Sequence, residues 1–289
     1  MRLTGRNRLC LFAPLAVLLT GGLGLPALLG LFATFTTYSP FATSIHFAGF
    51  SNFLSVIEDR QFGAAVRNIT VFTVVAVPLE LVIGFVVAYL LRRPIPGRGL
   101  WRLLLLLPWL VSPIANGVMW HFLLVGAHSI LDFAAGWLGQ SSIASPIGDA
   151  RLALPTIIAV EIWREAPFVA FLLLPGLLAV PTELWEHATL DGASWIRRIF
   201  TVALPSLRPL LLAITMLLVG LSLGTFDSVL ILTGGGPGSA SVTPALYSYN
   251  EAFVINNWPA GAASAWLIAF AVLGVGLVYI NLARRSDAR

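Results

Sequence analysis

The sequence predicts an all-α membrane protein with six transmembrane helices, and three observations lead to this prediction. Hydrophobic residues make up 58% of the 289 residues and charged residues only 10%, and the mean hydropathy is +0.89. A soluble domain of this length needs about a quarter charged residues to cover its surface. Six apolar segments are long enough to cross a bilayer. The arginines gather in alternate connections between them.

The six expected spans follow one another with short connections, at about residues 9–35, 68–91, 103–125, 152–178, 210–232 and 262–282. A signal peptide has the same charge order as the first 35 residues, but its apolar core is only about 7–15 residues long. We therefore expect an uncleaved first helix with its N-terminus inside. The segment 37–66 carries four apolar residues spaced like a helix lying on the membrane interface: Phe50, Phe53, Leu54 and Ile57.

The distribution of arginine predicts the orientation of these spans. Three arginines precede the first span, four follow the second, three lie between the fourth and fifth, and three end the chain. Only Arg60, Arg67 and Arg151 fall on the other side, and Arg164 lies within a span. Because arginine accumulates on cytoplasmic loops, both termini are expected to be cytoplasmic.

Several absences exclude function classes. All 17 basic residues are arginine, so the chain lacks the lysine that a P-loop places on nucleotide phosphates. Cys10 is the single cysteine, which excludes an intrachain disulfide and a cysteine-based zinc site; we interpret it as a thiol packed in a membrane helix. The four histidines form no cluster, and we expect no metal site. The high pI of about 9.8 reflects membrane topology, so no nucleic-acid partner is expected.

The longest polar connection, residues 180–209, is predicted to form a helix, a sharp turn and a second helix. Pro181 suits the start of the first helix, because its missing N–H is not needed there. Asp191-Gly192 predicts the turn, since glycine adopts backbone angles that other residues avoid. Ser194 is expected to cap the second helix, which should end near Leu204-Pro205.

This segment resembles the EAA loop of ABC importer permeases, through Glu186, Ala188, Asp191, Gly192, Ala193, Phe200, Leu204, Pro205 and Pro209. It departs from that pattern at His187, where alanine is usual. In that family the loop docks into a groove of a cytoplasmic ATPase. The resemblance implies that the docking residues are Leu184, Glu186, Ala188, Asp191, Gly192, Ala193, Trp195, Phe200, Leu204 and Pro205. The alternative is an ordinary cytoplasmic hairpin between two spans.

Further residues resemble the carbohydrate-type permeases, in particular the maltose and glycerol-phosphate branch: Trp163, Pro167-Phe168, Gly176, Pro181, Phe226-Asp227, Leu232–Pro237, Tyr247, Tyr249 and Ala252-Phe253. The resemblance implies a single transmembrane domain over residues 1–289 with the type I importer permease fold. It implies a non-catalytic subunit of an ATP-driven, binding-protein-dependent sugar importer in a bacterial inner membrane, forming half of the pore.

The partners implied by this resemblance are a cytoplasmic ATPase dimer that holds ATP and Mg²⁺, an extracytoplasmic binding protein and a second permease chain, which we expect to be a homologue. This chain is expected to bind no cofactor. The alternatives are two other classes of membrane protein. A secondary transporter driven by an ion gradient often shows similar halves, and none are found here. A membrane-embedded enzyme needs clustered acids or histidines, which the sequence lacks.

Polar side chains inside spans are expensive and mark candidate sites. Glu161 and Arg164 are three residues apart, so they share a helix face and can neutralise one another. Glu80 is expected to meet the partner permease instead. The predicted substrate pathway consists of Asn116, Trp120, Glu161, Trp163, Arg164, Phe226 and Asp227, because flat rings stack on sugar faces and polar groups bind hydroxyls. The alternative role for each is contact between helices.

Overall fold

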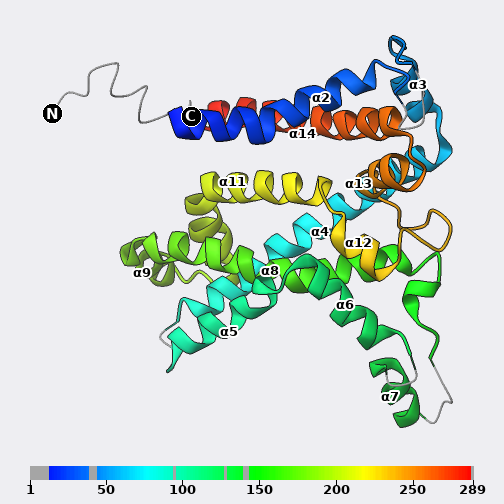
Figure 1. Ribbon diagram of the computed structural model, residues 1–289. Coiled ribbons are helices and arrows are strands. Elements are labelled where there is room, and N and C mark those ends of the chain that lie inside the picture. The colour runs from blue at the N-terminus through cyan, green and yellow to red at the C-terminus, as the bar shows by residue number, and fades with distance from the viewer. Residues whose placement is uncertain (1–12, 39–43, 94–95, 127–128, 139–142, 288–289) are drawn as a thin grey trace, which may run out of the picture. The chain divides into compact units, whose positions relative to one another are not determined.

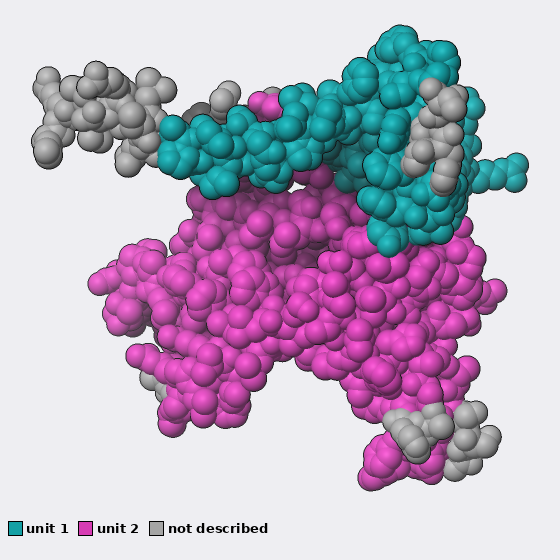
Figure 2. Space-filling model, viewed as in Figure 1, with its two compact units in different colours: residues 1–63, 247–269 teal, residues 64–246, 270–289 magenta. Residues whose placement is uncertain are grey.

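The computed structural model describes residues 13–38, 44–93, 96–126, 129–138 and 143–287, which are about 80% helical (Figure 1). The predictions for Cys10 and for the start of the first span lie outside these residues. No strand forms within them, although Thr36 and Phe47 make an isolated antiparallel bridge. The chain divides into two compact units, residues 1–63 with 247–269 and residues 64–246 with 270–289 (Figure 2). The single transmembrane domain stays a prediction.

Four helical stretches of the described chain are long and apolar enough to cross a membrane: Ala13–Thr34, Arg60–Leu91, Trp195–Leu223 and Trp258–Tyr279. Two helix pairs pass the same test together but are sharply bent. Helices α5 (Arg98–Leu110) and α6 (Pro113–Leu124) bend by 88°, and α8 (Ala153–Ala179) and α9 (Thr182–Leu190) bend by 76°. The described residues therefore supply four spans, or up to six if each bent pair is one span, and the predicted six is the upper value.

The first unit contains a π-helical turn η1 (Thr20–Gly24), α2 (Leu25–Thr34), α3 (Ser51–Glu58), the start of α4 (Arg60–Leu91), the end of α13 (Pro244–Tyr249), a π-helical turn η4 (Asn250–Val254) and the start of α14 (Trp258–Asp287). The Asn52 amide donates hydrogen bonds to the carbonyls of Thr34 and Thr36 at 2.8 and 2.9 Å. The predicted helix near Phe50–Ile57 is present as α3, and its position at the membrane interface stays a prediction.

The second unit has a hydrophobic core to which α4, α8, α9, the π-helical turn η3 (Ile199–Ala203) and α11 (Leu204–Leu223) all contribute. Small residues let these helices approach closely. A Cβ at Gly84 of α4 would lie 2.6 Å from the Val169 side chain of α8. A Cβ at Gly176 of α8 would lie 2.7 Å from Leu207 of α11. The remaining elements are α7 (Ile130–Trp137), a 3₁₀ turn η2 (Pro146–Gly148), α10 (Trp195–Arg198) and α12 (Asp227–Leu232).

The third expected span is two helices rather than one. Ser112 separates α5 from α6 in an extended conformation, with ψ of 149°. A proline disfavours the helical conformation of the residue before it, and Pro113 follows directly. The Ser112 hydroxyl accepts a hydrogen bond from the Ala115 N–H at 3.3 Å, so it caps α6.

The fifth expected span, residues 210–232, is wrong at both ends. The second helix of the 180–209 segment does not stop near Leu204-Pro205 as predicted. It continues into the fifth span, so that one helical stretch runs from Trp195 to Leu223. The turn before Pro205 is π-helical, and the Leu204 N–H donates to the Ile199 carbonyl. A proline ring collides with the preceding turn of a regular α-helix, and the wider π turn gives it room. At the other end Gly224 interrupts the helix, and α12 begins after this break.

Candidate functional site

Helix α9, the first half of the predicted docking element, has one buried face and a larger exposed one. Trp185 and Ala188 are three residues apart and therefore share a face. Both are buried in the core of the second unit. Leu184 and Glu186 are exposed, and Leu190 is 84% exposed. The core therefore holds α9 through two side chains and leaves the rest of its surface open.

A cation–π contact ties α9 to the end of α4. The Arg92 guanidinium lies 3.7 Å from the centroid of the Trp185 ring and 5.7 Å from that of Tyr89. Burial lowers the pKa of Arg92, but an arginine keeps its charge in proteins. Because Arg92 directly follows α4, this contact joins α9 to the end of that helix.

The turn after α9 has the predicted conformation. Gly192 has a φ of +70°, in the left-handed region that glycine adopts without strain. The Gly192 N–H donates to the Thr189 carbonyl and the Ala193 N–H to the Ala188 carbonyl, each at 3.0 Å. This pair of bonds is the Schellman arrangement that closes helix C-termini. Asp191, which is exposed, is the C-cap residue that follows α9 and precedes the glycine.

The second half of the element is also held locally. The Ser194 hydroxyl accepts a hydrogen bond from the Arg197 N–H at 3.3 Å, which confirms the predicted cap. Arg198 donates from Nη1 to the Thr189 hydroxyl at 2.8 Å, linking α10 back to α9. A surface cavity of about 400 Å³ is lined by Trp185, Glu186, Thr189 and Leu190. This hollow has the chemistry to receive a partner's side chain.

The predicted docking residues thus separate into groups. Leu184, Glu186, Asp191 and Gly192 lie at the exposed surface of α9 and its turn, whereas Ala188 is buried and Ala193 packs partly against the core. Three further residues, Trp195, Phe200 and Leu204, line a separate apolar groove shared with α4. Pro205 lies in the first turn of α11.

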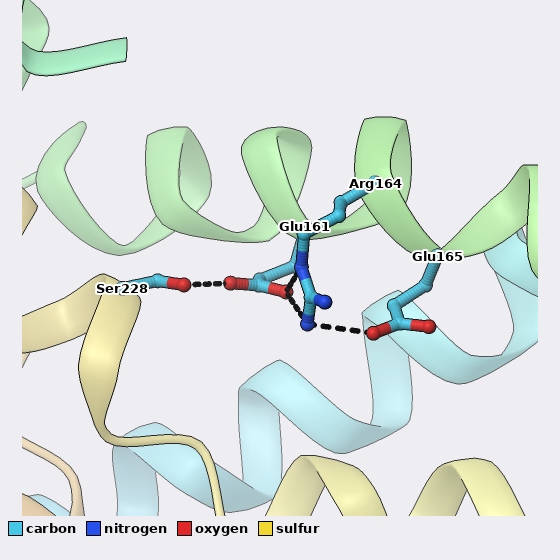
Figure 3. Close-up of polar contacts among 4 residues, drawn as sticks. All are labelled: Glu161, Arg164, Glu165 and Ser228. Atoms are coloured by element: carbon cyan, nitrogen blue, oxygen red, sulfur yellow. Dashed lines mark hydrogen bonds and ion pairs between the residues drawn. The ribbon is translucent and has the colours of Figure 1, made fainter. Parts of the chain in front are cut away.

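The middle of α8 carries a buried ion-pair network (Figure 3). Arg164 donates to Glu161 Oε2 from Nε at 3.2 Å and from Nη2 at 3.0 Å. The same Nη2 lies 2.6 Å from Glu165 Oε1. Ser228, in the first turn of α12, donates a hydrogen bond to Glu161 Oε1. The predicted pairing of Glu161 with Arg164 is confirmed, and the network also joins α8 to α12.

A small cavity lies beside this network. It has a volume of about 30 Å³, and its lining includes Glu80 of α4, the three charged α8 residues and Ser222 of α11. That volume holds at most two or three water molecules, since one water needs about 10–15 Å³. A sugar does not fit. The geometry therefore favours a structural role for Glu161 and Arg164 within this chain.

An amide and two indoles form a second polar group. Asn116 of α6 is fully buried, and neither atom of its amide has a hydrogen-bond partner among the described residues. Trp120 lies one turn further along the same face of α6, and its Nε1 also lacks a partner within the described chain. The Trp120 ring meets Trp163 of α8 edge-on, with centroids 5.6 Å apart. These three residues combine unused hydrogen-bonding groups with aromatic surface.

Phe226 and Asp227 lie at the break between α11 and α12. Asp227 opens α12 and is half-buried, and its carboxylate makes no hydrogen bond or ion pair within the described residues. The next residue, Ser228, makes the contact with Glu161. The structure therefore places Asp227 beside the charge network along the chain without bonding it to that network.

Sequence reasoning missed several residues of these sites. Glu165 directly follows Arg164, and side chains one residue apart on a helix do not face each other, so the spacing gives no reason to pair them. The sequence pattern does not predict the contacts of Ser228, Arg92 and Thr189. Their partners, Glu161, Trp185 and Arg198, lie beyond the three- and four-residue spacing of helix neighbours. No group of three His, Cys, Asp or Glu side chains that could hold a metal ion is found in the described part of the chain.

The fold and these sites define a multi-pass membrane protein whose exposed helical element is anchored between two candidate spans. The model of the family described as "Binding-protein-dependent transport system inner membrane component" matches residues 63–289, and the chain belongs to this family. The predicted resemblance to importer permeases is thereby confirmed.

Relatives of this chain include named sugar permeases. It is 32% identical to the trehalose/maltose transport system permease protein MalF of Thermococcus litoralis, over 82% of this chain and 80% of the relative. It is 28% identical to the sulfoquinovosyl glycerol transport system permease protein SmoG of Agrobacterium fabrum, over 96% and 90%. It is 27% identical to the sn-glycerol-3-phosphate transport system permease protein UgpA of Yersinia pestis, over 90% and 88%.

A solved structure confirms the fold. The chain aligns with a chain of a bacterial alginate ABC transporter, crystallised with an alginate-bound periplasmic protein, at a TM-score of 0.83. The alignment covers 96% of this chain and 93% of the other at 19% identity. The predicted all-helical importer permease fold is therefore confirmed, while the orientation of the termini stays a prediction.

Proposed function

We propose that this chain is a permease subunit of an ATP-driven, binding-protein-dependent importer of sugars or sugar derivatives. The observation that carries the proposal is the element at 180–209, in which a core-anchored α9 presents exposed Leu184, Glu186 and Leu190. A connection that only joins two spans does not require a helix that packs on the core with one face and exposes large apolar side chains on the other. The printed names of the relatives, which concern trehalose, maltose, sulfoquinovosyl glycerol and glycerol phosphate, support the substrate class.

In this proposal a cytoplasmic ATPase dimer receives α9 and its turn, and ATP with Mg²⁺ is held by that ATPase alone. Closure of the ATPase presses on the exposed face of α9. Trp185 passes the motion to α4 through Arg92 and to the core of the second unit. The chain itself binds no cofactor and catalyses no reaction.

The substrate pathway we propose centres on Asn116, Trp120 and Trp163, whose unused hydrogen-bonding groups and ring faces suit hydroxyls and sugar faces. Phe226 and Asp227 border it at the start of α12, and Glu161 with Arg164 hold that helix in place. A second permease chain, a homologue of this one, supplies the other half of the pore. An extracytoplasmic binding protein delivers substrate, and the complex lies in a bacterial inner membrane with both termini of this chain in the cytoplasm.

The test uses the tagged full chain purified in mild detergent from its own membranes, followed by reconstitution of the co-purifying complex. We expect an ATPase and a second permease chain to co-purify, and sugar uptake to require ATP and the binding protein. Leu190→Arg should reduce ATPase retention about tenfold or more, because it removes a large apolar contact. Leu190 is exposed, so the variant keeps its fold. Arg151→Asp, on the opposite side of the predicted topology, is the control.

Two results would contradict the proposal. One is a chain that remains alone after crosslinking in intact membranes. The other is uptake that continues without ATP and follows an ion gradient, which would make the chain a secondary transporter.

A further inference from the structure

A long apolar groove runs between the C-terminal half of α4 and the segment from α10 to α11. Its volume is about 740 Å³, within the range of roughly 300–1,000 Å³ that is common for small-molecule sites. Both walls belong to candidate membrane spans, Arg60–Leu91 and Trp195–Leu223. The groove therefore lies at the end of these two candidate spans that carries Arg93 and Trp195.

The lining of this groove is apolar apart from one cation. Val86 and Leu90 on one wall and Phe200 on the other are at least half exposed. Tyr89 and Trp195 add aromatic rings with one polar edge, which favour the depth of lipid headgroups. Arg93, just past the end of α4, is the single charged residue among the described residues of the lining.

The charge of Arg93 is available to a ligand. Its neighbour Arg92 is stacked on Trp185, and Arg198 is bonded to Thr189. Arg93 is exposed and makes no hydrogen bond or ion pair with any described residue. An apolar channel with a free guanidinium at its end matches a molecule that has a hydrocarbon chain and an anionic head.

We infer that this groove binds an anionic phospholipid, with an acyl chain along the apolar walls and the phosphate at Arg93. Guanidinium groups bind phosphate oxygens in a bidentate manner, and arginines at the cytoplasmic surface attract anionic lipids. The inference rests on the proposed orientation, which places this end of α4 at the inner leaflet. It gives Trp195, Phe200 and Leu204 a lipid contact in place of the ATPase contact that the sequence predicted.

The test measures quenching of a bimane fluorophore by brominated lipids. Cys10 is the only cysteine, so Cys10→Ser gives a background free of thiols. One full-length variant carries Val86→Cys, in the groove, and the other carries Val74→Cys, exposed on the same helix outside the groove. Each is labelled and reconstituted in phosphatidylcholine vesicles that contain either brominated phosphatidylglycerol or brominated phosphatidylcholine at equal fractions. For each site, the quenching constant for phosphatidylglycerol is divided by the one for phosphatidylcholine. This ratio removes the effect of the different depths of the two sites in the bilayer.

We expect phosphatidylglycerol to quench the Val86 site about fivefold more strongly than phosphatidylcholine, the preference one arginine gives near an anionic surface. The ratio at Val74 should be near one. Arg93→Gln should bring the Val86 ratio close to one, and Arg151→Gln should leave it unchanged. Equal ratios at the two sites, or an Arg93→Gln variant with the full ratio, would overturn the inference. Absence of quenching at Val86 by either lipid would also overturn it, because a protein helix then fills the groove.

The assay needs no ATPase. If the chain gave the expected quenching but bound no ATPase, the proposed function would be wrong and the inferred lipid site would stand.

Discussion

The buried network of α8 gives the sharpest prediction, made with Arg164→Met. Arg164 is the one cation in the described lining of a cavity that also contains the carboxylates of Glu80, Glu161 and Glu165. Methionine preserves most of the side-chain length but leaves the two α8 carboxylates without their partner. Breaking a buried ion pair in this way costs about 3–5 kcal/mol. We therefore expect a loss of that size in the free energy of unfolding.

The assay is reversible unfolding of the full chain in mixed micelles with increasing dodecyl sulfate, followed by helical circular dichroism. The decisive comparison is with the triple variant Glu161→Gln, Arg164→Met, Glu165→Gln. It removes both buried carboxylate charges together with the cation. Because an apolar or neutral replacement of a whole ion-pair group is often harmless, the triple variant should recover most of the lost stability.

Arg151→Met is the control, since Arg151 is exposed and lies before α8. An effect of Arg164→Met below about 1 kcal/mol, which is the value of an exposed pair, would refute the reasoning. A triple variant less stable than Arg164→Met would refute it equally, because the carboxylate charges would then not be the cause.

Three further predictions concern packing, turn geometry and pH. Gly84→Ala should cost about 1–3 kcal/mol of stability by overpacking, whereas Gly63→Ala on the same helix meets nothing within 4 Å and should be neutral or stabilising in the same assay. Gly192→Ala should lower ATPase retention, because φ of +70° strains alanine, and Gly192→Asn should lower it less. Burial, with the nearby charge of Asp59, raises the pKa of Glu251 in the folded chain above its usual 4.5. Protonated Glu251 therefore contributes its full stability below about pH 4.5, and this contribution is lost as the pH rises through the folded-state pKa. Glu251→Gln should flatten this decline in melting temperature as the pH rises above about 4.5, and an unchanged profile would contradict the assignment.

Features set by neighbouring residues could be predicted from the sequence. The turn at Gly192 and the cap at Ser194 depend on backbone geometry within five residues, and both are present. The Glu161–Arg164 pair depends on helical spacing alone. Hydropathy located α8 to within a residue or two, because its two ends coincide with the ends of an apolar segment.

Features set by tertiary contact could not be predicted. Ser228 lies 67 residues from Glu161, and no spacing rule connects them. Hydropathy also could not find the break at Gly224 or the bend at Ser112, since apolar residues continue on both sides of each. The helix through Pro205 persists because a π turn accommodates the ring, a local choice that a proline rule does not anticipate.

Helix α8 is the element that connects the two candidate sites. The exposed α9 follows it across a 76° bend, and its middle holds α12 through Glu161 and Ser228. Gly176 lies near the end of α8 that leads into α9, and it packs closely on α11. We therefore expect a displacement of α9 to move α8 and α11 together. Along α11 that motion meets the break at Gly224, whereas α8 is continuous from Ala153 to Ala179. We therefore expect displacement of α9 to reach α12 through α8, which places the Glu161–Ser228 bond on the route between the docking surface and the proposed pathway.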